Sequence, residues 1–195
     1  MIVSAILLAA GESKRMGRLK QLLPWQSSTM LEQTIDNLLA SSLHETIVVV
    51  GYQAKEVTEA IGNRPVKVVA NPNYEQGMSA SIIAGLKTAK RQAQAFVIAF
   101  ADQPLVSSQT IDRLINEFKN HDKGIVIPTY RGQRGHPVIF GIKYKQELLK
   151  LTGDIGGRQL VKAHPEDVFE VTIDSDNILT DIDTLRDYLF YLEQS

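Results

Sequence analysis

Residues 7–20 read Leu7-Leu8-Ala9-Ala10-Gly11-Glu12-Ser13-Lys14-Arg15-Met16-Gly17-Arg18-Leu19-Lys20, so an apolar run leads directly into a loop rich in glycine, hydroxyl and cationic side chains. The apolar residues 2–10 predict a buried strand that ends at Gly11. Glycine lets backbone amides approach a phosphate closely, while hydroxyl groups and cations add hydrogen bonds and positive charge. The loop therefore predicts a polyphosphate site, although an ordinary polar turn between a strand and a helix explains the same composition.

Two common phosphate-binding loops do not match this stretch. Five residues separate Gly11 from Gly17, and Arg18-Leu19-Lys20 follows, whereas a Walker A loop has four intervening residues and Lys-Ser/Thr after its second glycine. The G-x-G-x-x-G spacing of dinucleotide-binding folds is also missing from this stretch. The loop must therefore belong to another class if it binds phosphate.

The composition predicts a globular chain whose charge is nearly balanced. With 195 residues, of which 44% are hydrophobic and 22% charged, the chain is expected to form one domain, residues 1–195. A formal net charge of −1 argues against a nucleic-acid partner, because nucleic-acid domains usually carry a basic excess. Cysteine is absent, which excludes disulfides and thiolate metal sites and leaves oxygen ligands for any metal.

The apolar start of the chain predicts neither export nor a membrane anchor. No basic residue precedes residues 2–10, and this run is too short to cross a bilayer. We therefore expect a cytoplasmic protein without a membrane partner.

Apolar runs alternate with helical stretches along most of the chain. The expected strands are residues 2–10, 45–50, 66–70, 95–101, 124–128, 138–141 and 168–173. Helices are expected to end near residues 40, 61, 91, 119 and 151, with another at the C-terminus. This order predicts an α/β fold, a single Rossmann-like three-layer α/β/α domain with a mostly parallel sheet. In such folds ligands bind at the carboxyl ends of the strands.

Several polar residues are expected at this edge of the sheet, and each has an ordinary structural explanation as well. Asp102 ends the most apolar run in the middle of the chain and is also a typical turn residue. Ser79 lies where a helix opens and is a suitable cap. Asp183 and Thr184 precede the last helix, which either residue could cap.

The loop at residues 7–20 resembles the signature L-A-(A/G)-G-x-S-x-R-M-G-x-x-K of nucleotidyltransferases that form a pyrophosphate-linked product, and it matches every fixed position. The resemblance is closest to the molybdenum cofactor cytidylyltransferases of the MobA-like NTP transferase superfamily. Further matching segments extend it over nearly the whole chain: residues 77–81, 101–104, 135–137, 153–158 and 181–184. The resemblance implies a nucleotidyltransferase fold of the glycosyltransferase-A-like type.

The resemblance also implies which residues bind the nucleotide. The first loop would hold the phosphates, and residues 77–81 would lie beside the base. The implied nucleotide-binding residues are Ala9, Ala10, Gly11, Ser13, Arg15, Lys20, Gly77, Ser79 and Ser81. Those implied to be catalytic are Arg15, Lys20 and Asp102.

Metal and acceptor sites are implied in the same way. Asp102 would hold Mg²⁺ at the nucleotide phosphates, with Asp183 as the first choice for a second oxygen ligand and Asp181 as the second. The residues assigned to the acceptor side are His136, Asp154 and Arg158.

The implied reaction is the transfer of CMP from CTP to a molybdopterin-type phosphate with release of pyrophosphate. Ala10 favours CTP, because guanylyltransferases of this type carry glycine there. The resemblance also implies a molybdenum hydroxylase such as xanthine dehydrogenase as a possible receiving partner. Three alternatives stay open: a guanylyltransferase, a nucleotidyltransferase for sugar or polyol phosphates, and a non-catalytic molybdenum cofactor carrier.

Overall fold

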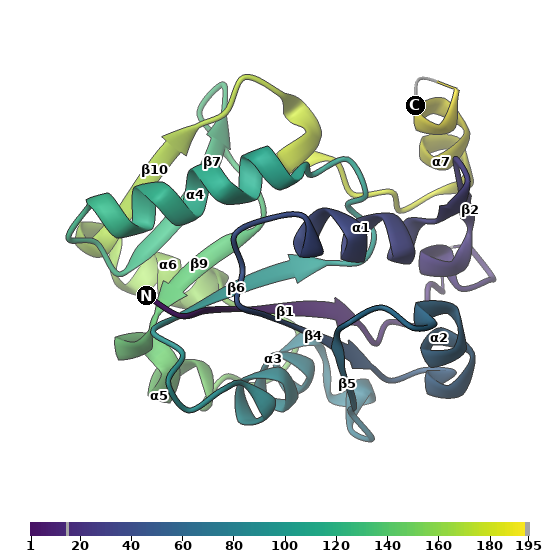
Figure 1. Cartoon of the computed structure of the whole chain (residues 1–195), viewed down its shortest axis with the longest axis horizontal. Helices are drawn as coiled ribbons and strands as arrows, with labels where there is room; N and C mark the ends of the chain where they lie inside the picture. Colours follow the sequence, from purple (N-terminus) through teal and green to yellow (C-terminus); the bar gives the residue numbers. More distant parts are fainter. Residues whose placement is uncertain (15, 194–195) are drawn as a thin grey trace.

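The computed structural model describes residues 1–14 and 16–193, so the predictions for Arg15 lie outside the described residues. Its centre is a twisted sheet with strand order β10-β7-β9-β6-β1-β4-β5 (Figure 1). The strands of this sheet are β1 (Val3–Ala9), β4 (Glu45–Val50), β5 (Lys67–Ala70), β6 (Ala95–Phe100), β7 (Ile125–Tyr130), β8 (Gln133–Arg134), β9 (Val138–Gly141) and β10 (Val168–Thr172). Each expected strand is present, with ends that differ by at most two residues.

The sheet is mixed, and most of its pairings are parallel. β1 lies between β4 and β6 and is parallel to both, and β4–β5 and β7–β10 are also parallel. β9 is antiparallel to its two neighbours, β6 and β7, and β8 forms a short hairpin with β7. The predicted α/β class with a mostly parallel sheet is confirmed.

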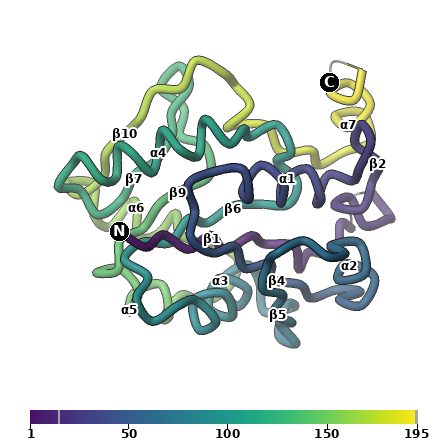
Figure 2. The backbone as a smooth tube through the Cα atoms, viewed as in Figure 1, coloured from purple at the N-terminus to yellow at the C-terminus, as the bar shows by residue number. Residues whose placement is uncertain are grey.

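Helices cover both faces of the sheet, and Figure 2 traces the chain between them. The α-helices are α1 (Met30–Leu39), α2 (Ala54–Ile61), α3 (Met78–Thr88), α4 (Ser108–Asn120), α5 (Lys145–Leu148), α6 (Arg158–Ala163) and α7 (Leu185–Leu192). Short 3₁₀ turns are η1 (Lys20–Leu22), η2 (Tyr74–Gln76), η3 (Ile142–Tyr144), η4 (Pro165–Asp167) and η5 (Asp176–Leu179). None of the helices formed by residues 1–14 and 16–193 is long and apolar enough to cross a membrane.

Alternation along β1 divides the core into two layers. Ala5 and Leu7 point to the face covered by α1, α2 and α4, whereas Ile6 points to the face covered by α3, α5 and α6. Side chains alternate along a strand, so one apolar run can fill both layers. The run at residues 2–10 is apolar except for the buried Ser4, which donates a hydrogen bond to Glu45 Oε2 at 2.8 Å, because both faces of β1 are buried.

A third, smaller core packs residues 23–30 against the C-terminal segment of the chain. Trp25 in the β2–β3 ribbon, β2 (Pro24–Trp25) and β3 (Ser28–Thr29), packs with Ile182 and with Tyr188 of α7. Tyr188 Oη donates a hydrogen bond to the Pro24 carbonyl at 2.6 Å. This contact holds α7 against the β2–β3 ribbon.

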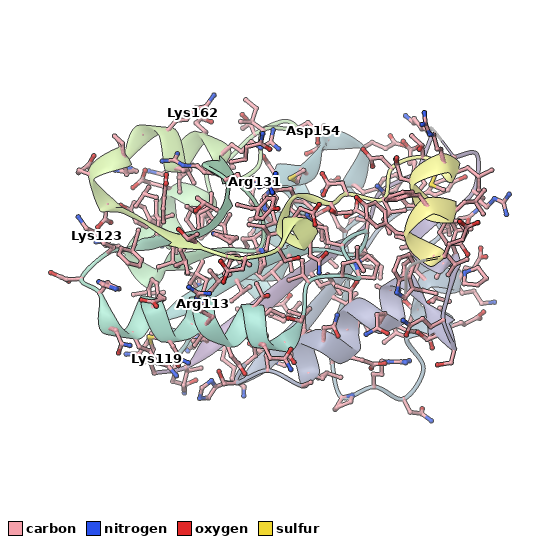
Figure 3. The ribbon with its side chains drawn as sticks, turned by 90° about the horizontal axis from the view of Figure 1, so that it is seen from above. Arg113, Lys119, Lys123, Arg131, Asp154 and Lys162 are labelled. Carbon is pink, nitrogen blue, oxygen red and sulfur yellow. The ribbon has the colours of Figure 1, made fainter. Side chains whose placement is uncertain are left out.

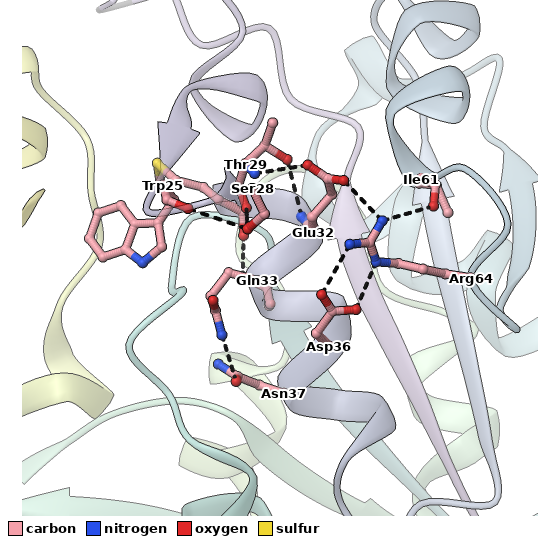
Figure 4. Close-up of polar contacts among 11 residues, drawn as sticks. Trp25, Ser28, Thr29, Glu32, Gln33, Asp36, Asn37, Ile61 and Arg64 are labelled. Atoms are coloured by element: carbon pink, nitrogen blue, oxygen red, sulfur yellow. Dashed lines mark hydrogen bonds and ion pairs between the residues drawn. The ribbon is translucent and has the colours of Figure 1, made fainter. Parts of the chain in front are cut away.

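Polar contacts also fix α1 (Figure 4). Thr29 and Glu32 form a capping box, in which Glu32 Oε2 accepts from the Thr29 amide at 2.8 Å. Arg64, just before β5, pairs with both oxygens of Asp36 at 2.7 and 3.0 Å and with Glu32 at 3.0 Å. The capping box fixes the start of α1, and Arg64 joins the helix to the segment that leads into β5.

Candidate active site

The loop after β1 is held together by two polar side chains. Ser13 Oγ accepts a hydrogen bond from the Lys20 amide at 3.1 Å and donates to Gln21 Oε1 at 3.1 Å. The buried Gln21 then donates from Nε2 to the carbonyls of Ala9 and Gly11, at 3.4 Å each. The start and the end of the loop are therefore fixed to each other, with Gly11 at its beginning.

Sequence reasoning did not single out Gln21, which proves central to this loop. The available signal was weak, because Gln21 is one polar residue followed by Leu22-Leu23. A buried glutamine needs hydrogen-bond partners, and here they are the serine and the carbonyls of the glycine loop.

Lys20 joins this loop to two carboxylates that are distant in sequence. Its Nζ lies 2.5 Å from Asp102 Oδ2 and 2.6 Å from Asp183 Oδ1. Asp102 follows β6 and Asp183 precedes α7, so the three predicted residues meet at the carboxyl edge of the sheet. The side chains of Lys20 and Asp102 are 18% and 17% exposed and that of Asp183 is 37% exposed, so solvent still reaches the cluster.

The electrostatics of the cluster favour a charged lysine. Burial alone would lower the pKa of Lys20, but the charges and hydrogen bonds of Asp102 and Asp183 outweigh that effect and raise it. The ammonium group is therefore a fixed positive charge at this edge of the sheet.

Asp181 lies beside the cluster but has a different partner. Its Oδ1 accepts a hydrogen bond from Gln103 Nε2 at 2.7 Å. Desolvation raises the pKa of Asp181, and the nearby charges of Asp102 and Asp183 raise it further. Ile182, which separates Asp181 from Asp183 in the sequence, is fully buried. Its amide donates a hydrogen bond to the Asp102 carbonyl at 3.1 Å.

The two carboxylates that share Lys20 have the chemistry of ligands for a divalent metal ion. Asp102 and Asp183 direct one oxygen each toward a single cation position. Mg²⁺ is often held by one or two carboxylates together with substrate phosphates and water. Within the part of the chain that the structure describes, no group of three or more His, Cys, Asp or Glu side chains could hold a metal by itself. The donor set therefore suits a metal that arrives with a phosphate ligand.

The second predicted loop opens α3. Gly77 is the residue before this helix and has φ of 97°, and a Cβ there would lie 2.6 Å from the Gly153 carbonyl carbon. Only glycine suits both the backbone and the space. Ser81 accepts a hydrogen bond from Asn71 Nδ2 at 3.0 Å, whereas the buried Ser79 hydroxyl has no protein partner among the described residues.

Asp154, predicted on the acceptor side, contacts the start of α3 (Figure 3). Its Oδ1 accepts from the Met78 amide at 3.0 Å, and the Ser79 amide donates to the Gly153 carbonyl at 3.1 Å. Carboxylates stabilise helix N-termini by accepting from amides that lack a partner within the helix. The structure therefore gives Asp154 a helix-capping role that the sequence pattern did not indicate.

His136 and Arg158 lie on the later part of the chain. The His136 ring packs edge-on against Phe100, with ring centroids 4.6 Å apart, and its amide donates to the Ile178 carbonyl at 2.9 Å. Burial and then the charge of Arg158 lower the pKa of His136 to about 4, so the imidazole is neutral at physiological pH. Its Nδ1 is buried without a protein partner among the described residues, while Arg158 is exposed at the first position of α6.

A cleft of about 480 Å³ lies between the β7–β8 turn and α7. Arg131, labelled in Figure 3, lies at this turn. Its guanidinium carbon is 5.1 Å from the centroid of the Tyr130 ring. Sequence reasoning did not anticipate this cleft. Its lining residues are Tyr130, Arg131, Gln133, Asp176, Leu179, Thr180, Asp181, Asp187 and Tyr191.

The α/β sheet, the glycine loop after β1 and the paired carboxylates at the sheet edge define the class of nucleotidyltransferases. Residues 5–168 match the MobA-like NTP transferase domain, and the chain belongs to this family. The resemblance found in the sequence is thus confirmed at the level of the family.

Two curated relatives cover nearly the whole chain. Over 188 residues the chain is 29% identical to the molybdenum cofactor cytidylyltransferase of Escherichia coli (strain K12), spanning 96% of this chain and 94% of that protein. Over 194 residues it is 30% identical to the nicotine blue oxidoreductase of Paenarthrobacter nicotinovorans, spanning 94% and 93%.

Solved structures share the fold over a similar length. Rv0371c from Mycobacterium tuberculosis H37Rv superposes with a TM-score of 0.90 at 32% identity, covering 98% of this chain and 97% of that one. A complex of Rv0371c with manganese superposes with a TM-score of 0.85 at 28% identity and covers both chains fully.

Proposed function

We propose that this nucleotidyltransferase transfers CMP from CTP to the phosphate of a molybdopterin-type acceptor and releases pyrophosphate. The observation that carries the proposal is the cluster of Lys20, Asp102 and Asp183 beside the glycine loop that starts at Gly11. Such a cluster supplies a cation for phosphates and two carboxylates for Mg²⁺. The similarity to a molybdenum cofactor cytidylyltransferase supports the choice of nucleotide and acceptor.

In the proposed reaction the first loop binds the triphosphate. Amides near Gly11 and the predicted cation Arg15 hold the β- and γ-phosphates, and Lys20 lies at the α-phosphate. Ser13 joins them by exchanging its hydrogen bond to Gln21 Oε1 for one to a phosphate oxygen. Mg²⁺ held by Asp102 and Asp183 would neutralise charge on the phosphates. These contacts orient the α-phosphorus and stabilise the negative charge that develops on the departing pyrophosphate.

The acceptor phosphate is itself the nucleophile. One of its oxygens forms a bond to the α-phosphorus, the bond from that phosphorus to the bridging oxygen breaks, and the electron pair leaves with pyrophosphate. No covalent enzyme intermediate is needed. His136, as a neutral hydrogen-bond donor, and Arg158, as an exposed cation, are proposed to orient the acceptor. Asp154 contributes by holding the start of α3, next to Gly77 and Ser79.

The local packing of Ala10 bears on the choice of base. A Cβ on Gly51 would lie 2.8 Å from the Ala10 methyl and 2.6 Å from Tyr74 Cβ, so these three residues form a close wall. We propose that the base lies against this wall, as the family resemblance implies for Ala10; the methyl group would then leave less room for a purine, which supports CTP over GTP. The guanylyltransferase alternative predicts the opposite preference.

Binding can be tested without an acceptor. With Mg²⁺ present, CTP is expected to raise the melting temperature more than GTP, ATP or UTP at the same concentration, because selective binding stabilises the folded state. A larger shift with GTP would favour the guanylyltransferase alternative. Equal shifts, or none, with all four nucleotides would contradict the proposed selectivity.

Turnover separates the remaining alternatives. Pyrophosphate release that depends on molybdopterin supports the proposed acceptor, whereas release that depends on a sugar or polyol phosphate supports another acceptor class. Tight molybdopterin binding without release of pyrophosphate would indicate a carrier, and turnover of nicotine blue would indicate the activity named for the other relative. Delivery of the product to a molybdenum hydroxylase such as xanthine dehydrogenase is a proposed later step.

A further inference from the structure

The ammonium group of Lys20 lies between the two carboxylates that we propose as Mg²⁺ ligands. We infer that Lys20 is an internal counter-ion that keeps the Asp102–Asp183 pair closed to metal until a bound nucleotide draws the ammonium group away. The inference rests on the proposed function, because it concerns the metal site assigned there. It adds an order of events: nucleotide and metal bind together, and metal alone binds weakly.

The distances show that the ammonium group and a metal ion cannot both occupy the position between Asp102 Oδ2 and Asp183 Oδ1. Nζ lies 2.5 Å from Asp102 Oδ2 and 2.6 Å from Asp183 Oδ1, so it occupies the point at which the two oxygens converge. Mg²⁺ binds carboxylate oxygen at about 2.0–2.1 Å. An ion bridging these same two oxygens would overlap Nζ. Bridging of these two oxygens by a metal ion therefore requires that the ammonium group move.

The chain allows this movement and limits its direction. The backbone of Lys20 is fixed, because its amide donates to Ser13 Oγ at 3.1 Å and its carbonyl accepts from the Leu23 amide at 3.0 Å. The side chain has a flexible four-carbon stem, so Nζ can turn about this anchored backbone. Ser13 belongs to the proposed phosphate loop, and phosphates bound there would offer the ammonium group new anionic partners.

When a metal ion replaces the ammonium group between the carboxylates, each charged group keeps a partner of opposite charge. Before nucleotide binds, one ammonium group neutralises part of the charge of two carboxylates. Afterwards the divalent ion contacts both carboxylates and the phosphates, and Lys20 contacts the phosphates. Bound nucleotide thus raises the affinity for metal, and by thermodynamic linkage bound metal raises the affinity for nucleotide by the same factor.

A purely structural ion pair makes a different prediction. In that case the loss of Lys20 would lower stability and leave the affinity for divalent metal unchanged. The two explanations therefore differ in metal binding without nucleotide, which can be measured independently of turnover.

The first arm of the test measures Mn²⁺ binding to the nucleotide-free protein by the electron paramagnetic resonance signal of free Mn²⁺. We expect Lys20→Met to bind Mn²⁺ at least tenfold more tightly than wild type. The double variant Lys20→Met/Asp102→Asn should lose this gain. Lys14→Met is the matched control, since it removes the same charge from an exposed side chain of the same loop, and it should bind like wild type.

The second arm measures melting temperature, because the signal of free Mn²⁺ no longer reports binding to the protein once CTP chelates the ion. In wild type, Mn²⁺ alone should change the melting temperature little, while Mn²⁺ with CTP should raise it by more than the sum of the separate shifts. In Lys20→Met, Mn²⁺ alone should raise it.

Two outcomes would overturn the inference, and they differ in what else they affect. In the first outcome, wild type and Lys20→Met bind Mn²⁺ equally well, and Mn²⁺ with CTP still stabilises wild type but not Asp102→Asn. This result would refute the proposed role of Lys20 and leave the proposed metal and nucleotide sites intact. If no protein binds Mn²⁺ and CTP does not stabilise wild type, the proposed metal and nucleotide sites are wrong as well.

Discussion

Asp102 is the residue on which the proposed chemistry depends most. It shares Lys20 with Asp183, whereas Asp181 is hydrogen-bonded to Gln103. We expect Asp102→Asn to lower the rate of pyrophosphate release by about 10²–10³-fold, since removing one stabilising electrostatic contact has effects of this size. Asp183→Asn should have a smaller effect, because an amide oxygen still coordinates metal weakly.

Asp181→Asn serves as the comparison for these two variants. Its effect on the rate should be the smallest of the three in purified proteins with equal melting temperatures. If Asp181→Asn is damaging and Asp183→Asn is silent, the second ligand has been assigned to the wrong aspartate.

His136 provides a prediction about pH. Its folded-state pKa is about 4, below the ordinary value of 6.5, so the neutral ring contributes full stability above pH 6.5 and this contribution is lost as the pH falls through about 4. Relative to wild type, His136→Gln should show less loss of unfolding free energy between these pH values, by up to about 3 kcal/mol. Denaturant titrations at several pH values would measure the difference.

The control for this experiment is His121→Gln, which removes a histidine from the surface end of α4. It measures how much the removal of a surface histidine changes stability at each pH. A His136→Gln protein that loses stability with acid as steeply as wild type would show that His136 does not titrate as its surroundings indicate.

At the scale of elements, Asp154 connects two segments that were predicted to act separately. Asp154→Ala removes the acceptor for the Met78 amide and should lower the free energy of unfolding by about 1 kcal/mol, as for loss of a helix cap. Asp154→Asn retains an acceptor oxygen and should lose less. Thermal or denaturant unfolding of both variants measures this. Equal stability of Asp154→Ala and wild type would remove the capping role and favour a direct contact with the acceptor.

Arg64 tests whether an ion pair between elements stabilises the fold. It contacts Asp36, Glu32 and the Ile61 carbonyl, and its side chain is 22% exposed. Arg64→Ala should lower the free energy of unfolding by about 1 kcal/mol, because partly exposed ion pairs contribute at this level. Lys55→Ala breaks an exposed pair with Glu59 that spans 3.9 Å and should change stability much less. The same unfolding energy for both variants would contradict this ranking.

Most elements could be predicted from sequence because their signals are local. The β-branched run at Glu45–Val50 forms β4 with those same ends, and Thr29 with Glu32 caps α1 as the pattern indicates. The expected helix 144–151 is instead a 3₁₀ turn, Ile142–Tyr144, followed by one α-helical turn, Lys145–Leu148. Its short apolar pattern could not establish a length.

At the scale of the whole molecule, strand order and long-range contacts were beyond sequence reasoning. The sequence of an apolar run such as Val138–Gly141 does not indicate whether the strand will be parallel or antiparallel to its neighbours. In the structure this strand is antiparallel to both of them. Likewise, Lys20 and Asp183 are 163 positions apart, and only the resemblance to a family suggested that both serve one site. The cleft beside α7 arises from three separate segments, none of which has a distinctive pattern.

The central claim is that the cluster at the sheet edge supports transfer of CMP to a molybdopterin-type phosphate. The most direct measurement supplies Mg²⁺, CTP labelled at the α-phosphorus, and molybdopterin, and follows both label and pyrophosphate. We expect wild type to transfer label to the acceptor with one pyrophosphate released for each transfer, and Asp102→Asn to do so at least a hundredfold more slowly. An unlabelled acceptor after incubation with folded wild-type protein that binds CTP would contradict it.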